Sequence, residues 1–216
     1  MLLGLTGGYC AGKNAVAAIL ERRGWTCVDV DRLGHEAVDA ARDAIVARFG
    51  PGVLGPDGRV DRKAVARIVF ADPAALADQE AIVHPAAIRL TDARIAAAEG
   101  LARAEGREPR VCVNAALLYR TPQAGRCDAI IEVRAPLLVR LRRAQVRDGV
   151  GPRRALERML RQRPFWRLRG SSGRPVALVR NDGGLAALEA ALDRSLAGPL
   201  AAILATGPRR GAADVL

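Results

Sequence analysis

The feature that most constrains this chain is a glycine-rich turn between an apolar strand and a helix. Leu2–Thr6 is a mainly apolar run, Gly7–Asn14 is the glycine-rich turn, and Ala15–Leu20 is the predicted helix that follows. This order fits the phosphate-binding P-loop, G-x-x-x-x-G-K-[ST], at every position except the last, where Asn14 stands. Glycines allow backbone N–H groups to curl around an anion, and a helix N-terminus adds partial positive charge. The sequence therefore predicts a nucleotide-phosphate site.

Lysine usage supports this interpretation over an ordinary glycine-rich turn. Lys13 and Lys63 are the two lysines of the chain, which otherwise uses arginine. A flexible ammonium can reach the β- and γ-phosphates as a compact charge, which a planar guanidinium cannot copy. We therefore expect Lys13 to be catalytic and Asn14 to offer its amide oxygen to Mg²⁺. The residues expected to bind the nucleotide here are Gly7, Gly8, Tyr9, Cys10, Ala11, Gly12, Lys13, Asn14 and Ala15.

Length and composition favour one compact domain over a membrane or secreted protein. The chain has 216 residues, half of them hydrophobic, yet no apolar stretch approaches the ~18 residues of a membrane span. No signal-peptide pattern is read at the N-terminus. Its four cysteines have no metal-ligand spacing, which suggests reduced thiols and a cytoplasmic location. One of them, Cys10, precedes a predicted helix N-terminus that could lower its thiol pKa.

Positive charge is concentrated in one part of the chain. The net charge is +11, and residues 134–180 hold 14 arginines but only two acids, Asp148 and Glu157. This imbalance predicts a polyanionic partner, either nucleotide phosphates or nucleic acid. With only Phe165 and Trp166 as aromatic residues in that segment, no specific nucleic-acid binding is expected.

Alternating apolar segments predict an α/β fold. Strands are expected at 2–6, 25–31, 111–118, 129–133 and 176–180, and helices at 33–49, 62–69, 82–104, 136–147 and 185–204. Continuous apolar strands behind a P-loop favour a P-loop NTPase-type doubly wound parallel sheet.

Two further groups of residues are candidates for phosphoryl-transfer chemistry. Asp31 is predicted to end the second strand, where its carboxylate could accept a hydrogen bond from a substrate hydroxyl. A helix N-cap is the structural alternative. Arg143 and Arg147 lie four residues apart on one helix face, and the arginine-dense segment 153–163 that follows suggests a mobile lid. By itself, His84 is more typical of a packed or surface residue.

These residues together resemble the dephospho-coenzyme A kinase family over nearly the full chain. The matching elements are Gly4–Gly8 with Gly12-Lys13, Asp29–Arg32, Phe49-Gly50, Ile68–Pro73, His84-Pro85, Leu117-Leu118, Arg143 with Arg147-Asp148, Gln162 and Asn181–Gly183.

The resemblance implies transfer of the ATP γ-phosphate to the ribose 3′-hydroxyl of dephospho-coenzyme A, with Mg²⁺. It implies a nucleotide-binding core (1–31, 108–148 and 172–216), a helical substrate-binding insertion (32–107) and an arginine-rich lid (149–171). Asp31 would be the catalytic carboxylate, and Arg143 and Arg147 would be catalytic arginines. The other implied contacts are Arg32, His84, Pro85 and Leu117, with Asp31, for the acceptor, and Asn181 and Gly183 near the adenine.

The chain departs from the family pattern at the loop and at position 120. The usual Gly-Ile-Gly-Ser-Gly-Lys-Ser becomes Gly8–Asn14 here, and Arg120 stands where the family has a glutamate. Two alternatives therefore stay open: a P-loop kinase of another small acceptor, such as a nucleoside monophosphate, and a nucleotide-binding protein that has lost catalysis.

Overall fold

The computed structural model describes residues 1–198, 200 and 201, which form two compact units. The first is built from Met1–Val28 and the described residues from Ala97 onward, and the second is Asp29–Ala96.

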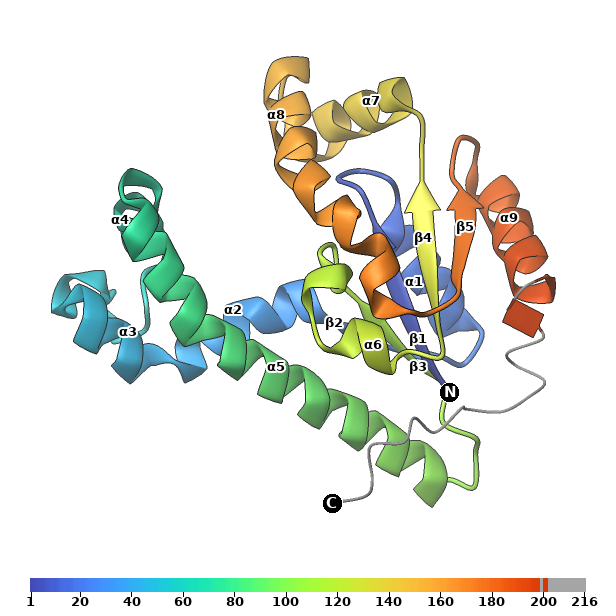
Figure 1. The fold of residues 1–216 in the computed structure, drawn as a ribbon, viewed down its shortest axis with the longest axis horizontal. Helices are drawn as coiled ribbons and strands as arrows, with labels where there is room; N and C mark the ends of the chain where they lie inside the picture. Colours follow the sequence, from blue (N-terminus) through green and yellow to red (C-terminus); the bar gives the residue numbers. More distant parts are fainter. Residues whose placement is uncertain (199, 202–216) are drawn as a thin grey trace. The chain divides into compact units, whose positions relative to one another are not determined.

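The first unit contains a five-stranded sheet with β1 at its centre (Figure 1). The strands are β1 (Leu2–Gly7), β2 (Thr26–Asp29), β3 (Val111–Asn114), β4 (Ala129–Arg134) and β5 (Val176–Arg180), in the order β2-β3-β1-β4-β5. β1 runs parallel to β3 and β4, and β4 runs parallel to β5. The chain therefore winds first to one side of β1 and then to the other, which confirms the predicted doubly wound α/β fold. In such a sheet, ligands bind outside the carboxyl ends of the strands where the winding reverses.

The main core lies between this sheet and the helices α1 (Lys13–Arg22) and α9 (Leu185–Ala197). Leu5 of β1 and Ile131 of β4 are fully buried and cluster with Leu20 of α1 and Leu192 of α9. Apolar residues three and four apart place one face of each helix on the sheet. The P-loop is thus anchored by a buried strand before it and a packed helix after it.

Two short 3₁₀ helices and α6 lie in front of the sheet, opposite α1 (Figure 1). They are η2 (Leu118–Arg120), α6 (Gln123–Arg126) and η3 (Arg163–Ser172). The helices α7 (Leu137–Asp148) and α8 (Pro152–Gln162) form a hairpin before η3. Gly149, with φ of 64°, ends α7, and Pro152 begins α8, as is typical of helix ends. Cys10 of the P-loop packs against this hairpin.

The second unit is helical. It contains α2 (Val30–Ala40), α3 (Arg42–Phe49), η1 (Pro51–Val53), α4 (Arg62–Ala71) and most of α5 (Pro73–Ala104), which continues into the first unit. Its own core is formed mainly by valines and an isoleucine: Val38, Ile45, Val53, Val60, Val65 and Val69, with Ala75.

Several predicted boundaries are wrong. The second strand ends at Asp29 because the Asp29 carboxylate accepts a hydrogen bond from Arg32 N at 3.1 Å and so caps α2. The helix predicted at 33–49 is two helices that meet at Ala41. The strand predicted at 111–118 stops at Asn114.

The helices α5 and α9 also differ from their predicted ranges. α5 begins at Pro73, nine residues before its predicted start, and accommodates Pro85 in its interior. α9 ends at Ala197, and the final residues of its predicted range belong partly to 199 and 202–216, which lie outside the described residues. No helix in the described part of the chain is long and apolar enough to cross a membrane.

Candidate active site

The P-loop is closed by its own backbone. Ala11 N donates to Gly8 O at 2.8 Å, and Ala15 N donates to Gly12 O at 3.0 Å, which starts α1. Cys10 and Gly12 have left-handed backbones, with φ of 59° and 98°. Left-handed residues in such a turn direct successive N–H groups into a concave nest for an anion. The loop therefore has the geometry of a phosphate cradle.

Lys13 and Asn14 are joined by a side chain from the neighbouring strand. Lys13 Nζ donates to Asn114 Oδ1 at 2.6 Å, and Asn114 Nδ2 donates to Asn14 Oδ1 at 3.5 Å. Asn114 is the last residue of β3 and is buried. The sequence analysis did not select it. The available signal was a polar residue inside the apolar run at 111–118.

The loop is also fixed to the end of β5. Asn181 Nδ2 donates to Ala11 O at 2.9 Å, and Arg143 donates to Asn181 Oδ1 at 3.0 Å and to Asn181 O at 3.2 Å. A Cβ on Gly12 would collide with the Asn181 amide. The structure thus brings together the loop, Arg143 and Asn181, three parts of the predicted site. Gly183 is exposed two residues further on, before α9.

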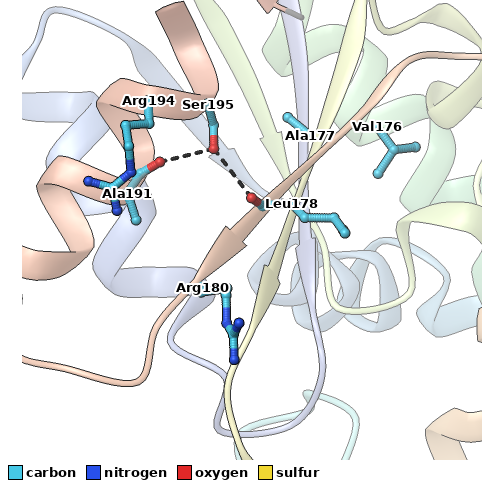
Figure 2. Close-up of a pocket in the computed structure, with 7 residues that line it drawn as sticks. All are labelled: Val176, Ala177, Leu178, Arg180, Ala191, Arg194 and Ser195. Atoms are coloured by element: carbon cyan, nitrogen blue, oxygen red, sulfur yellow. Dashed lines mark hydrogen bonds between the residues drawn. The ribbon is translucent and has the colours of Figure 1, made fainter. Parts of the chain in front are cut away.

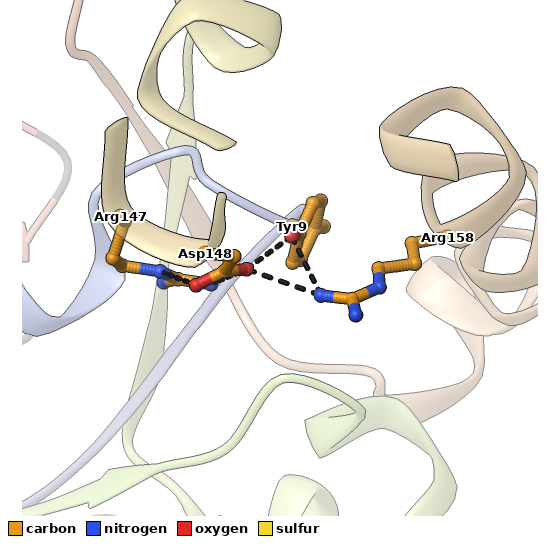
Figure 3. A network of polar contacts seen from close by, with 4 residues as sticks. All are labelled: Tyr9, Arg147, Asp148 and Arg158. Carbon is orange, nitrogen blue, oxygen red and sulfur yellow. Dashed lines mark hydrogen bonds and ion pairs between the residues drawn. The ribbon is translucent and has the colours of Figure 1, made fainter. Parts of the chain in front are cut away.

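Tyr9 connects the loop to both helices of the hairpin (Figure 3). Its ring lies 5.4 Å from the guanidinium carbons of both Arg147 and Arg158. Its hydroxyl donates to Asp148 and accepts from Arg158 Nη1 at 2.8 Å. Arg147 hydrogen-bonds Asp148 at 2.7 Å and holds the pKa of that carboxyl well below its usual range. Burial, and then the hydrogen bond to Asp148, raise the pKa of the Tyr9 hydroxyl.

The backbone of Tyr9 is held by the same hairpin. Tyr9 N donates to Gln162 Oε1 at 2.7 Å, and Arg140 Nε donates to Tyr9 O at 2.8 Å. The glycine at position 8 permits this approach, because a Cβ there would lie 2.9 Å from an Arg140 nitrogen. The sequence analysis named neither Arg140 nor Gln162 as a site residue.

The thiol of Cys10 behaves differently from the sequence expectation. Burial raises its pKa and outweighs the lowering effect of Arg147. The net direction is therefore opposite to the lowering that the helix N-terminus led us to expect.

The remaining predicted residues are distributed over both units. In the second unit, Asp31 and Arg32 lie exposed in the first turn of α2, and His84 and Pro85 lie exposed within α5. Asp31 is therefore helical, since the strand ends two residues earlier. In the first unit, Leu117 is half-buried between β3 and η2.

A separate hollow of about 360 Å³ lies between β5 and α9 (Figure 2). Its hydroxyl group, Ser195 Oγ, donates to the backbone oxygens of Ala191 and Leu178 at 2.9 and 3.3 Å. Among the described residues, its lining comes from these two elements, with Arg180 and Arg194 contributing charge, and includes no residue of the predicted site.

The geometry of the first unit suits the binding of a polyphosphate. A concave backbone, a lysine ammonium and an exposed amide oxygen converge at the carboxyl ends of β1 and β3. The arginine-rich hairpin of α7 and α8 contacts the same loop. Guanidinium groups can stabilise charge on transferring phosphoryl oxygens.

Comparison with known proteins identifies relatives over most of the chain. A family model described as dephospho-CoA kinase matches residues 1–173. A dephospho-CoA kinase from Geobacter metallireducens is 46% identical over 168 residues, 76% of this chain and 81% of that protein. One from Anaeromyxobacter dehalogenans is 40% identical over 202 residues, 91% of this chain and 90% of that protein. The crystal structure of TT1252 from Thermus thermophilus is similar with a TM-score of 0.72 and 35% identity, and the match covers 91% of this chain and 96% of that one.

Proposed function

The chain belongs to the dephospho-CoA kinase family, and we propose that it transfers the ATP γ-phosphate to the ribose 3′-hydroxyl of dephospho-CoA. It is an ATP-dependent kinase with a P-loop kinase fold. The observation that supports the proposal most is the hydrogen bond from Lys13 Nζ to Asn114 Oδ1 at 2.6 Å, which ties the lysine that follows the loop to the last residue of β3.

ATP is proposed to bind with its phosphates in the loop from Gly7 to Ala15. The N–H groups of the loop and the Lys13 ammonium would contact the β- and γ-phosphates. Asn181 and Gly183 would flank the adenine. This is supported by the hydrogen bond between Asn181 and Ala11 O, which couples the end of β5 to the loop.

Asn14 is the proposed protein ligand of Mg²⁺. Mg²⁺ prefers oxygen ligands and is commonly bound by one or two protein oxygens together with substrate phosphates and water. The Asn14 side chain fits this role because it is exposed next to Lys13 and its Oδ1 is oriented by Asn114. Bound Mg²⁺ would neutralise charge on the β- and γ-phosphates.

Asp31 is proposed to act as the general base. The acceptor 3′-hydroxyl would pass its proton to the Asp31 carboxylate while its oxygen bonds to the γ-phosphorus, and the bond from that phosphorus to ADP would break. Arg32, His84, Pro85 and Leu117 would contact the acceptor. The exposure of Asp31 and Arg32 in the first turn of α2 supports an acceptor-facing role.

The region 149–171 is proposed to act as a lid over the phosphates, with the helical insertion at 32–107 binding the acceptor. Arg143 and Arg147 would stabilise charge in the transition state, and their contacts with Asn181 and Asp148 hold them beside the loop. A cytoplasmic location forms part of the proposal and is supported by four cysteines that are free thiols.

The test is ADP release by the purified protein with ATP, Mg²⁺ and dephospho-CoA, beside adenosine and nucleoside monophosphates as acceptors. Turnover that requires dephospho-CoA supports the proposal. Turnover with a nucleoside monophosphate alone would instead favour a kinase of another small acceptor. ATP binding without turnover of any acceptor would favour a protein that has lost catalysis.

A further inference from the structure

A cavity of about 370 Å³ lies beside the P-loop, and apart from Gly8 and Ala11 of the loop its lining residues have no role in the mechanism above. Its floor is the carboxyl end of β4, residues 132–135, and it extends to Gly8 of the loop. Arg140 of α7 lines it, together with Trp166 and Arg169 of η3. The cavity thus adjoins the phosphate cradle on the β4 side of β1.

Glu132 is a buried carboxylate in the wall of this cavity. Its side chain is only 3% exposed. It accepts hydrogen bonds from Arg134 Nε at 2.6 Å and from the Tyr119 hydroxyl at 3.3 Å, and it forms an ion pair with Arg169 Nε at 2.8 Å. A buried carboxylate is costly unless it is paired in this way. Glu132 therefore fixes two guanidinium groups, one from the sheet and one from η3.

The position of this acid is not the one that the family resemblance suggests. The resemblance expects a glutamate at position 120, but the guanidinium of Arg120 lies over the ring of Phe165 at 4.8 Å. The buried carboxylate comes instead from β4, where it contacts the neighbouring Tyr119. The cavity is consequently lined by both Glu132 and arginines.

The cavity carries an excess of positive charge. One acidic residue, Glu132, and three arginines, Arg134, Arg140 and Arg169, line it. Arg140 is half-buried and donates to Tyr9 O, and no acidic side chain of the described residues lies within ion-pair distance of it. Burial accordingly lowers the pKa of Arg140. An anion in the cavity would offset the cost of burying that charge.

We propose that this cavity binds a phosphate-bearing group of a substrate, with Arg134, Arg140 and Arg169 as its anion contacts and Glu132 as the residue that positions two of them. Guanidinium groups bind phosphate oxygens in a bidentate manner, and the indole of Trp166 offers a flat apolar wall to the organic part. The inference rests on the proposed function, in which ATP and dephospho-CoA both carry a diphosphate. The experiment therefore has to separate these two sources.

Trp166 provides a direct reporter of occupancy. The chain has two tryptophans, so Trp25→Phe leaves Trp166 as the only one. We expect its fluorescence to change saturably with dephospho-CoA, ADP or inorganic pyrophosphate. A response to dephospho-CoA alone assigns the cavity to the acceptor, and a response to ADP alone assigns it to the donor. The Trp166→Phe protein, which retains Trp25, should not respond. Silence of Trp166 towards all three ligands would overturn the proposal.

Arg140 and Arg142 form a matched pair on α7, because Arg142 is exposed and does not line the cavity. Arg140→Gln should raise the dissociation constant of the responding ligand about tenfold or more, the loss expected for a charged hydrogen bond. Arg142→Gln should change it by no more than about twofold. Equal effects of the two substitutions would refute the proposed anion contact.

Glu132→Gln tests positioning without changing the size of the side chain. It should raise KM for the responding substrate more than it lowers kcat, because the arginines lose their fixed orientation. A lower kcat with an unchanged KM would contradict a positioning role. Melting curves show whether Glu132→Gln folds. If it does not, the comparison of Arg140→Gln with Arg142→Gln decides whether the cavity binds the anion.

Turnover measured on the Trp25→Phe protein separates the two proposals. Suppose dephospho-CoA is turned over, Trp166 fluorescence does not change with any ligand, and Arg140→Gln and Arg142→Gln have equal effects. The cavity proposal is then rejected and the kinase proposal is retained. Pyrophosphate binding that depends on Arg140, without turnover of dephospho-CoA, would retain the cavity and reject the proposed acceptor.

Discussion

Lys13 Nζ lies 2.6 Å from Asn114 Oδ1, so the cation of the P-loop is held by the last residue of the adjacent strand. The same amide group donates from its nitrogen to Asn14 Oδ1 at 3.5 Å. One buried asparagine thus orients both the ammonium and the proposed metal ligand. The carboxyl end of β3 therefore shapes the phosphate site as directly as the loop itself.

Asn114→Ala should lower kcat/KM for ATP by about ten- to a hundredfold, because a hydrogen bond to a charged group contributes about 1.5–3 kcal/mol. Lys13→Ala should abolish turnover. If Asn114 acts through Lys13, the double variant should bind ATP no more weakly than Lys13→Ala alone. Calorimetric ATP dissociation constants of the three variants measure this coupling, since they do not require turnover. Fully additive losses would show that Asn114 acts independently of the lysine.

Gly12→Ala should weaken ATP binding about tenfold or more, because the new Cβ collides with the Asn181 amide that holds Ala11 O. Gly24→Ala is the matched control. Gly24 also has a positive φ, 82°, but a Cβ there meets nothing within 4 Å. Both variants should lose about 1 kcal/mol of unfolding free energy from backbone strain. Calorimetric titration with ATP should detect a defect in Gly12→Ala only, and equal affinities would argue against the Asn181 contact.

Asn14→Ser should preserve or raise Mg²⁺-dependent activity, because the hydroxyl is the oxygen usually found at this position of a P-loop. Asn14→Ala should require a higher Mg²⁺ concentration for half-maximal turnover. Titration of activity with Mg²⁺ for the three proteins measures the difference. An inactive serine variant would show that the local geometry requires the amide, with its contact to Asn114.

The sequence predicted the parts of this fold that depend on local pattern. The P-loop, the buried central strands and the parallel sheet followed from glycine spacing and apolar runs. These fold predictions are confirmed because glycine turns and continuous apolar strands are determined by residues close together in the sequence. The contact between Arg143 and Asn181 joins two residues that were selected from the sequence.

Long-range contacts could not be predicted in the same way. In the sequence, Asn114 lies inside one predicted strand, and Glu132 is a polar residue inside another. Their roles depend on Lys13, Arg134 and Arg169, which topology brings together from distant parts of the chain. Asp31 was predicted at the end of a strand but lies in a helix, and the cause is local. Either of two aspartates could have capped α2, and Asp29 is the one that does.

Asp31→Asn should lower kcat about a hundredfold or more, the usual contribution of a general base, and leave ATP affinity nearly unchanged. Asp29→Asn is the matched control two residues away. Because asparagine caps a helix as well as aspartate, this variant should fold normally and retain its kcat. Rapid-mixing kinetics with saturating substrates would compare the two. Normal turnover in Asp31→Asn would remove Asp31 from its proposed role.

Tyr119 should make stability depend on pH in the alkaline range. Burial, and then the charge of Glu132, raise the pKa of Tyr119 to about 12. An unfolded tyrosine ionises near pH 10, so the contribution of Tyr119 to stability is complete below that pH and is lost as pH rises towards 12.

In a Tyr9→Phe protein, Tyr119 is the only tyrosine. At pH 11 its tyrosinate absorbance should indicate about a tenth ionised in the native state, against about nine-tenths in urea. Glu132→Gln should move the native value towards the unfolded one, since it removes the repulsive charge. Equal ionisation with and without urea would contradict the buried environment of this hydroxyl.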